Sequence, residues 1–176
     1  MTKNFSIVGL SIILAVSIFL YSKDTTPEKN VFGDNVVVQI GLIVKDIEKT
    51  SQAYADFLGV DKPEWFLTDT VDKAHTEFKG KATKAQAKLA FFQMENITIE
   101  LIEPVNGPST WQEFLETNGE GVHHIAFEIE GMDEKIKMLA AKKMPLIQKG
   151  DYEGGRYSYI DSSQQLKVLL ELLENF

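Results

Sequence analysis

The chain has 176 residues, of which 44% are hydrophobic, and it carries a formal net charge of -8. This length fits one globular domain, and the apolar content is sufficient to fill its core. The acidic balance, with no basic stripe interleaved with aromatic residues, argues against nucleic acid as a partner. The absence of cysteine excludes disulfides and thiol nucleophiles.

The first part of the chain differs from the rest. Residues 5–21 carry no charge and are bracketed by Lys3 and Lys23, a length at the short end for a bilayer-spanning helix. The end of this run lacks the small residues of a cleavage site, which favours an uncleaved anchor over a secretory signal. We therefore expect an N-terminal apolar helix within residues 1–22, a membrane-anchored and extracytoplasmic domain, and a polar linker over residues 23–34. The alternative is a secreted or periplasmic protein after signal cleavage.

The remainder of the chain contains an internal repeat. Residues 37–60 and 122–145 each predict an alternating apolar strand followed by a helix with apolar residues every three to four positions. Each half then closes on a similar strand, ITIELIE at 97–103 and VLLELLE at 168–174. Two copies of one supersecondary unit are the simplest explanation of this pattern.

An aromatic-rich run in each half, KLAFFQ and RYSYI, adds a further strand. Residues 35–106 and 119–176 thus each predict a β-α-β-β-β unit. Thr110 and Glu113 fit a capping box that opens a short connecting helix between the two units. We predict an α+β domain over residues 35–176, in which the two repeats form one cupped mixed sheet.

Four polar residues occupy equivalent positions in the two repeats. Gln39 and His124 lie at the same point of the first strands, and Glu100 and Glu171 at the same point of the last strands. A single glutamate in an alternating strand usually lies on a solvated face. Two equivalent pairs related by a pseudo-twofold axis would instead bring four side chains together. Two carboxylates, an amide oxygen and an imidazole suit one divalent ion of borderline hardness, such as Zn, Ni, Co, Mn or Fe.

Residues 35–175 resemble the vicinal-oxygen-chelate superfamily, in which each repeat gives two ligands to a metal inside a cupped sheet. The first strand is similar to the form DHIGIAVKDLEKA, with Gln39 where many members have His. The second half, STWQEFLETNGEGVHHIAFEIEG, resembles methylmalonyl-CoA epimerases, whose ligand is the second His, here His124. Glyoxalase I has the same order of ligands as Gln39, Glu100, His124 and Glu171.

The resemblance implies a metal-dependent lyase or isomerase that moves a proton beside a metal-chelated carbonyl. Glu171 resembles the glutamate that shuttles the proton, and Glu100 is the candidate on the opposite face. Gln39 in place of a histidine counts against the iron dioxygenases of the superfamily. The alternative is a non-catalytic module of the same fold that binds or sequesters a small molecule. Family members often form homodimers.

Several further residues are weaker candidates for the site. Strand alternation predicts that His123 points away from His124. Glu77 is a weak candidate for a second acid/base group. The lysines between Lys73 and Lys88 are a candidate binding site for an anionic substrate, and a solvated loop is the alternative. The aromatic candidates for a pocket wall or for the core are Trp65, Phe66, Tyr157 and Tyr159.

Overall fold

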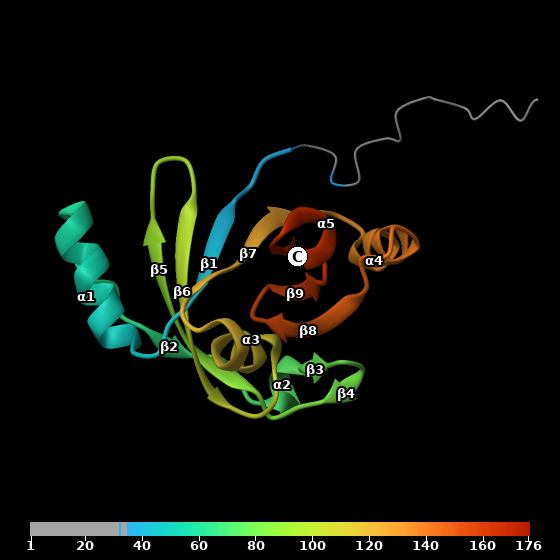
Figure 1. Ribbon diagram of the computed structural model, residues 1–176, viewed down its shortest axis with the longest axis horizontal. Helices are drawn as coiled ribbons and strands as arrows, with labels where there is room; N and C mark the ends of the chain where they lie inside the picture. The colour runs from blue at the N-terminus through green and yellow to red at the C-terminus, as the bar shows by residue number, and fades with distance from the viewer. Residues whose placement is uncertain (1–31, 33–34) are drawn as a thin grey trace, which may run out of the picture.

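The computed structural model describes residue 32 and residues 35–176, where ten strands form one curled sheet (Figure 1). The strands are ordered β2-β5-β6-β1-β7-β10-β9-β8-β3-β4, and both parallel and antiparallel pairs occur. The predicted α+β domain with a cupped mixed sheet is thereby confirmed. The predicted N-terminal apolar helix and nearly all of the predicted linker lie outside the described residues.

The elements follow the predicted repeat. The first half contains β1 (Gln39–Ile43), α1 (Ile47–Leu58), β2 (Phe66–Leu67), β5 (Gln86–Gln93) and β6 (Thr98–Asn106). Between β2 and β5 the chain inserts α2 (Val71–Ala74), β3 (Glu77–Phe78) and β4 (Lys81–Ala82). The connector is α3 (Thr110–Asn118). The second half contains β7 (Gly121–Glu128), α4 (Met132–Ala141), β8 (Leu146–Tyr152), β9 (Gly155–Ile160), α5 (Ser163–Leu166) and β10 (Leu169–Asn175).

The hydrogen-bond register of the sheet repeats between the two halves. Strands β1 and β7 pair antiparallel at the centre, with β6 parallel to β1 and β10 parallel to β7. Each glutamate pairs with the residue two positions after the Gln or His of its own half. Glu100 pairs with Gly41, and Glu171 pairs with Ala126. The pseudo-twofold axis therefore passes between β1 and β7, and it relates the two halves residue by residue.

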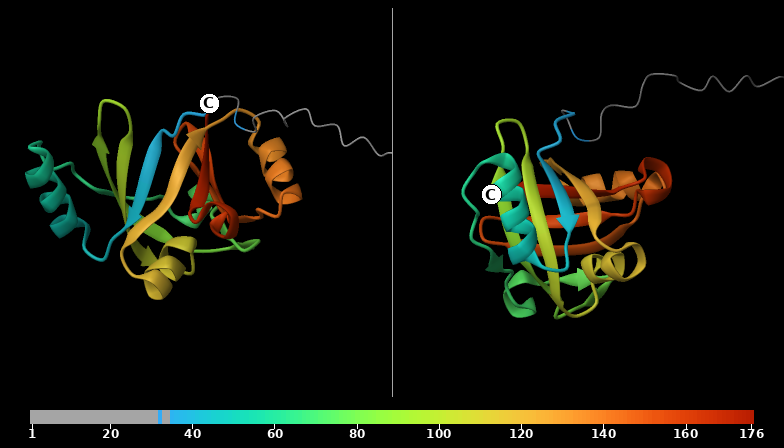
Figure 2. Two further views of the ribbon diagram at one scale, coloured as in Figure 1. Left: turned by 45° about the horizontal axis from the view of Figure 1, so that its top comes forward. Right: turned by 60° about the vertical axis from the view of Figure 1, so that its left-hand side comes forward.

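The two longer helices cover the outer sides of the curled sheet (Figure 2). Helix α1 begins after Asp46, whose side chain accepts a hydrogen bond from the backbone N–H of Lys49. The outward residues of each half pack beneath its helix. Leu101 lies in the cluster under α1, and Leu172 lies in the cluster under α4. Each such fully buried side chain contributes about 1.5–3 kcal/mol to the free energy of unfolding, which fixes the outward face of the strand. Because side chains alternate along a strand, the polar residues next to these leucines face inward.

The connector helix begins one residue earlier than its predicted capping box. Ser109 is the N-cap and accepts a hydrogen bond from the backbone N–H of Gln112. The predicted cap, Thr110, is instead bonded through its backbone N–H and its hydroxyl to the buried side chain of Gln148. This contact fixes α3 against the second half and turns Trp111 into the interior.

The insertion between β2 and β5 joins the two halves in a way that the repeat did not predict. Strand β3 pairs with β8 of the second half, and the backbone N–H of Lys79 donates to the carbonyl of Ile147 at 2.7 Å. The β3–β4 hairpin thus extends the sheet at the edge of the other repeat. In Figure 1 this hairpin and α2 lie together at the lower end of the cup.

The predicted membrane-anchored, extracytoplasmic location is corrected by the structure. Within the described part of the chain, no helix is long and apolar enough to cross a bilayer. The longest helix there is α1, with 12 residues. At a rise of 1.5 Å per residue it spans about 18 Å, whereas the hydrocarbon core is about 30 Å thick. Residues 5–21, on which the prediction rested, lie outside the described residues.

Candidate metal centre

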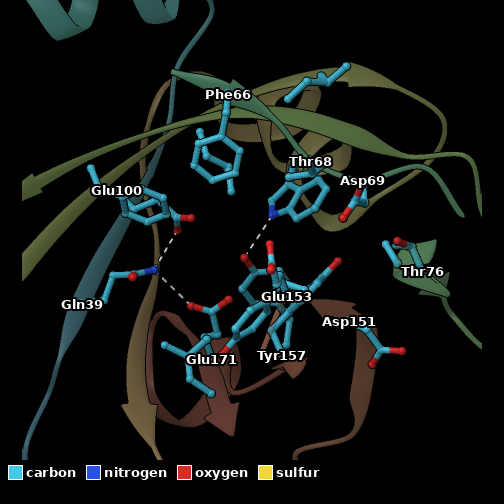
Figure 3. A pocket seen from close by; sticks show the side chains of 18 residues that line it. Gln39, Phe66, Thr68, Asp69, Thr76, Glu100, Asp151, Glu153, Tyr157 and Glu171 are labelled. Carbon is cyan, nitrogen blue, oxygen red and sulfur yellow. Dashed lines mark hydrogen bonds between the residues drawn. The ribbon is translucent and has the colours of Figure 1, made fainter. Parts of the chain in front are cut away.

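Four buried polar side chains converge on the inward face of the sheet, one from each of the strands β1, β6, β7 and β10. Strand alternation places them there, because the neighbours of each glutamate point outward to the helices. They are exposed by at most 9% of their surface. Figure 3 shows the carboxylates of Glu100 and Glu171 directed at the amide of Gln39. The structure thus brings together all four residues that the repeat singled out, in one polypeptide.

The distances between these groups are those of ligands around one ion. Nε2 of Gln39 lies 2.8 Å from Oε2 of Glu100 and 3.3 Å from Oε2 of Glu171. Nε2 of His124 lies 3.0 Å and 3.4 Å from the same two oxygens, in the order Glu171, Glu100. Ligands at about 2.1 Å from an ion are separated by about 3.0 Å in octahedral and about 3.4 Å in tetrahedral geometry. Rotating the Gln39 amide by half a turn presents its oxygen at the same point.

Electrostatics also favours a cation at this point. Burial, and then the charge of Glu171, raise the pKa of Glu100 well above its usual range. Two buried carboxylates this close are costly to ionise together unless a positive charge compensates them. Among the described residues, one cluster of His, Asp or Glu side chains is close enough to hold an ion, and it consists of Glu100, His124 and Glu171. The donor set therefore fits a divalent metal.

Gly41 makes room for the imidazole of His124. A Cβ atom placed on Gly41 would overlap the His124 ring. The ring therefore occupies the space next to the backbone of Gly41, with its Nε2 atom toward the two carboxylates. A glycine inside a strand often marks such a close approach, so Gly41 is a sequence signal for this contact.

The prediction that His123 points away from the site is wrong. The register between β1 and β7 shifts at this point, so that Gly41 pairs with His124 and Leu42 with Val122. His123 is the extra residue of a β-bulge, which interrupts the alternation of side chains. Both imidazoles are therefore buried, and their Nδ1 atoms lie 3.0 Å apart. Burial, and then the charge of His124, lower the pKa of His123 well below its usual range.

A cavity of 570 Å³ opens onto Gln39, Glu100 and Glu171. Six of its eighteen lining residues are aromatic, and they include three of the four predicted aromatic candidates. Trp65 is outside them, and its indole N–H donates to Glu48. The aromatic lining residues are Phe66, Phe91, Trp111, Tyr152, Tyr157 and Tyr159, and further carboxylates are supplied by Asp69, Asp151 and Glu153.

The lysines of the predicted binding segment do not line the cavity, although Ala74 and Thr76 of the same segment do. Lys88 is on the outer side of β5, where it pairs with Glu103 at 2.6 Å. Lys73 pairs with Asp69, and Lys79 pairs with Glu113. These three side chains therefore form surface ion pairs, and the predicted contact of the lysines with an anionic substrate stays a prediction.

Glu77 is likewise not a lining residue, and it forms an ion pair with Lys149 at 3.4 Å. Sequence reasoning also missed parts of the cavity. Trp111 comes from the connector helix, and Asp69 from the segment before α2. Asp151 and Glu153 come from the end of β8 and its turn. These positions have no local signal, because they depend on how the insertion and the hairpin meet across the cup.

Comparison with known proteins agrees with this geometry. The family model described as Glyoxalase/Bleomycin resistance protein/Dioxygenase superfamily matches residues 38–160. The chain therefore belongs to this superfamily. A curated relative, the uncharacterized protein YqjC of Bacillus subtilis, is 29% identical over 143 residues, which are 80% of this chain and 92% of that protein.

Solved structures with this fold include methylmalonyl-CoA epimerases. The enzyme from Mycobacterium tuberculosis is 19% identical, with 85% of this chain and 92% of that chain covered and a TM-score of 0.57. A Streptomyces coelicolor epimerase variant in complex with 2-nitronate-propionyl-CoA is 21% identical, with 80% and 96% covered and a TM-score of 0.54. At these identities the likeness establishes the fold.

Proposed function

We propose that this protein is a metal-dependent lyase or isomerase that transfers a proton at a carbon next to a carbonyl group. One divalent ion would be held by Gln39, Glu100, His124 and Glu171. The observation that carries the proposal is the spacing of these four buried groups, which matches the spacing of ligands around one ion. When bound, such an ion supplies Lewis acidity toward a carbonyl oxygen.

The chain's own residues supply the proton transfer. Glu100 and Glu171 both line the cavity, so their carboxylates are accessible to a bound substrate from two strands on different sides of the site. A carboxylate within hydrogen-bond reach of the substrate carbon removes the proton and returns it. We assign this role to Glu171, with Glu100 as the second candidate.

Tyr159 is placed to assist. Its hydroxyl accepts a hydrogen bond from the indole N–H of Trp111 at 3.1 Å. Burial, followed by the charges of Glu171 and Glu100, raises the pKa of Tyr159 well above its usual value, so the hydroxyl stays protonated. Its own proton is then available to a substrate oxygen in the cavity, where negative charge develops as the neighbouring C–H ionises.

The superfamily supports a proposal of this class, since solved members with the same fold are methylmalonyl-CoA epimerases. All four proposed ligands come from one chain, so the centre does not require the predicted homodimer. The donor set, with two carboxylates, one amide and one imidazole, suits Mn, Fe, Co, Ni or Zn.

The proposal is tested by exchange of carbon-bound hydrogen with solvent. The full chain is loaded with each of the five metals and incubated in D₂O with hydroxyacetone or with methylmalonyl-CoA. NMR then follows loss of the proton beside the carbonyl. Exchange that requires metal and is lost in Glu171→Gln, but not in the surface control Glu116→Gln, supports the proposal. Stoichiometric metal without exchange of either compound would instead favour the alternative, a binding module without catalysis.

A further inference from the structure

We infer that the cavity above the candidate metal centre selects an uncharged or positively charged small molecule and disfavours anionic thioesters and phosphates. The inference deepens the proposed function, and it relies on that function only for the position of the substrate's chelating end. The argument rests on the walls of the cavity, which lie beyond the four proposed ligands.

The charged residues of the cavity are all acidic. Glu100 and Glu171 lie at its floor, and a divalent ion would compensate their two charges. Three more carboxylates, those of Asp69, Asp151 and Glu153, line the cavity farther out (Figure 3). None of the described lining residues is lysine or arginine. A phosphate or carboxylate group on the substrate would therefore meet like charges without the donors that normally bind it.

Two of the outer carboxylates have surface partners, which weaken the negative potential of the cavity but do not reverse it. Lys73 lies 3.4 Å from Asp69, and its side chain is 70% exposed. His75 lies 2.8 Å from Asp151, and its side chain is also 70% exposed. Both partners are largely exposed, so water and salt screen their interaction with the two carboxylates. The chain as a whole adds a net charge of -8.

The aromatic walls complete a lining that suits apolar or cationic groups. Phe66 of β2 and Phe91 of β5 stack at 6.0 Å in the first half. Tyr157 of β9 stacks on Trp111 at 6.1 Å in the second half. Figure 3 shows Phe66 and Tyr157 on opposite sides of the cavity. Ring faces combined with carboxylates attract alkylammonium groups and also accept uncharged apolar groups. The volume of 570 Å³ is typical of a small-molecule site.

The test uses three ligands that share one chelating end and differ in charge at the other. They are benzohydroxamic acids with a para trimethylammonium, tert-butyl or sulfonate group, of which the first two have the same shape. Their dissociation constants are measured by calorimetry on the metal-loaded full chain. We expect the trimethylammonium compound to bind about tenfold more tightly than the sulfonate, with the tert-butyl compound between them. In Asp151→Asn/Glu153→Gln the ratio falls to about threefold, whereas the control Glu134→Gln, which removes a charge from α4, leaves it unchanged.

Equal or tighter binding of the sulfonate would overturn the inference, as would failure of all three compounds to bind the metal-loaded chain. If the chain takes up no metal, the proposed function fails, and the charge preference of the cavity is measured with ligands that need no metal. Phenyltrimethylammonium and benzenesulfonate, which need no metal, are then compared on the metal-free chain. Preference for the cation sustains the inference, and preference for the anion or equal binding overturns it.

Discussion

The imidazole of His124 lies against the backbone of Gly41, its partner across strands β1 and β7. This contact places Nε2 of the ring beside both carboxylates of the site. The absence of a side chain at Gly41 on β1 thus leaves the space in which the His124 ring on β7 takes this orientation.

Gly41→Ala is expected to displace the His124 ring and to weaken metal binding by at least about tenfold. The added methyl group overlaps the ring, and such overpacking also costs about 1–3 kcal/mol of the free energy of unfolding. Metal affinity is measured by competition with a chromogenic chelator, and folding by circular dichroism. Gly155→Ala is the control for overpacking, because the atoms nearest to its methyl group belong to the ring of Tyr152 and not to a proposed metal ligand. Unchanged affinity in Gly41→Ala would show that the ring does not need this space.

The contact between His123 and His124 gives a second prediction. If Nε2 of His124 binds the proposed metal through its lone pair, the ring carries its proton on Nδ1. Nδ1 of His123, 3.0 Å away, is then placed to accept that proton. His123→Phe removes the acceptor and should weaken metal binding by about 10–100-fold.

His123→Asn is the conservative variant, because its side-chain oxygen can take the place of Nδ1, and it should recover most of the affinity. The thermal midpoint of each metal-free variant separates this effect from a loss of folding. Equal metal affinities for the Phe variant and the parent would contradict the assigned role.

The metal-stripped protein should become less stable as pH rises above about 4.5. Because the pKa of Glu100 is raised in the folded chain, the folded state binds more protons than the unfolded state above the usual glutamate range. The associated stability is therefore present at low pH and is lost as pH rises through the folded pKa. Glu100→Gln should remove this pH dependence, and saturating metal should suppress it. Thermal midpoints between pH 5 and 8 measure the effect, at about 2–4 °C per kcal/mol.

An equal pH dependence of the midpoint in the metal-free parent and in Glu100→Gln would show that Glu100 and Glu171 do not compete for a proton, because His123, whose lowered pKa favours folding as pH rises toward 6.5, contributes equally to both proteins. Glu116→Gln, at an exposed position of α3, is the control for loss of a surface charge.

Glu171→Gln should lower the rate of hydrogen exchange by at least about 100-fold, because an amide cannot accept the proton, and should also weaken metal binding. The rate is therefore measured at saturating metal, which separates the two effects. Full activity of this variant would exclude Glu171 as the shuttling base and would direct attention to Glu100.

Much of the fold and of the candidate site could be predicted because the sequence contains an internal repeat, and each half of it carries two of the four site residues. The equivalent positions of Gln39 and His124 predicted the convergence, and strand alternation predicted the inward faces. Alternation failed at His123, where a bulge inserts one residue and leaves no mark in the sequence. The sequence also did not predict the pairing of β3 with β8 or the cavity carboxylates of Asp69, Asp151 and Glu153, since both depend on contacts between segments far apart in the chain.

The central claim is tested most directly by measuring metal content. The full chain and the variants Gln39→Ala, Glu100→Ala, His124→Ala and Glu171→Ala are dialysed against each divalent metal and analysed by elemental mass spectrometry, with Glu116→Ala as the control. The account predicts one equivalent of metal in the parent and the control, and a loss in each of the four variants. A parent that takes up no metal, or four variants that retain it, would contradict the account.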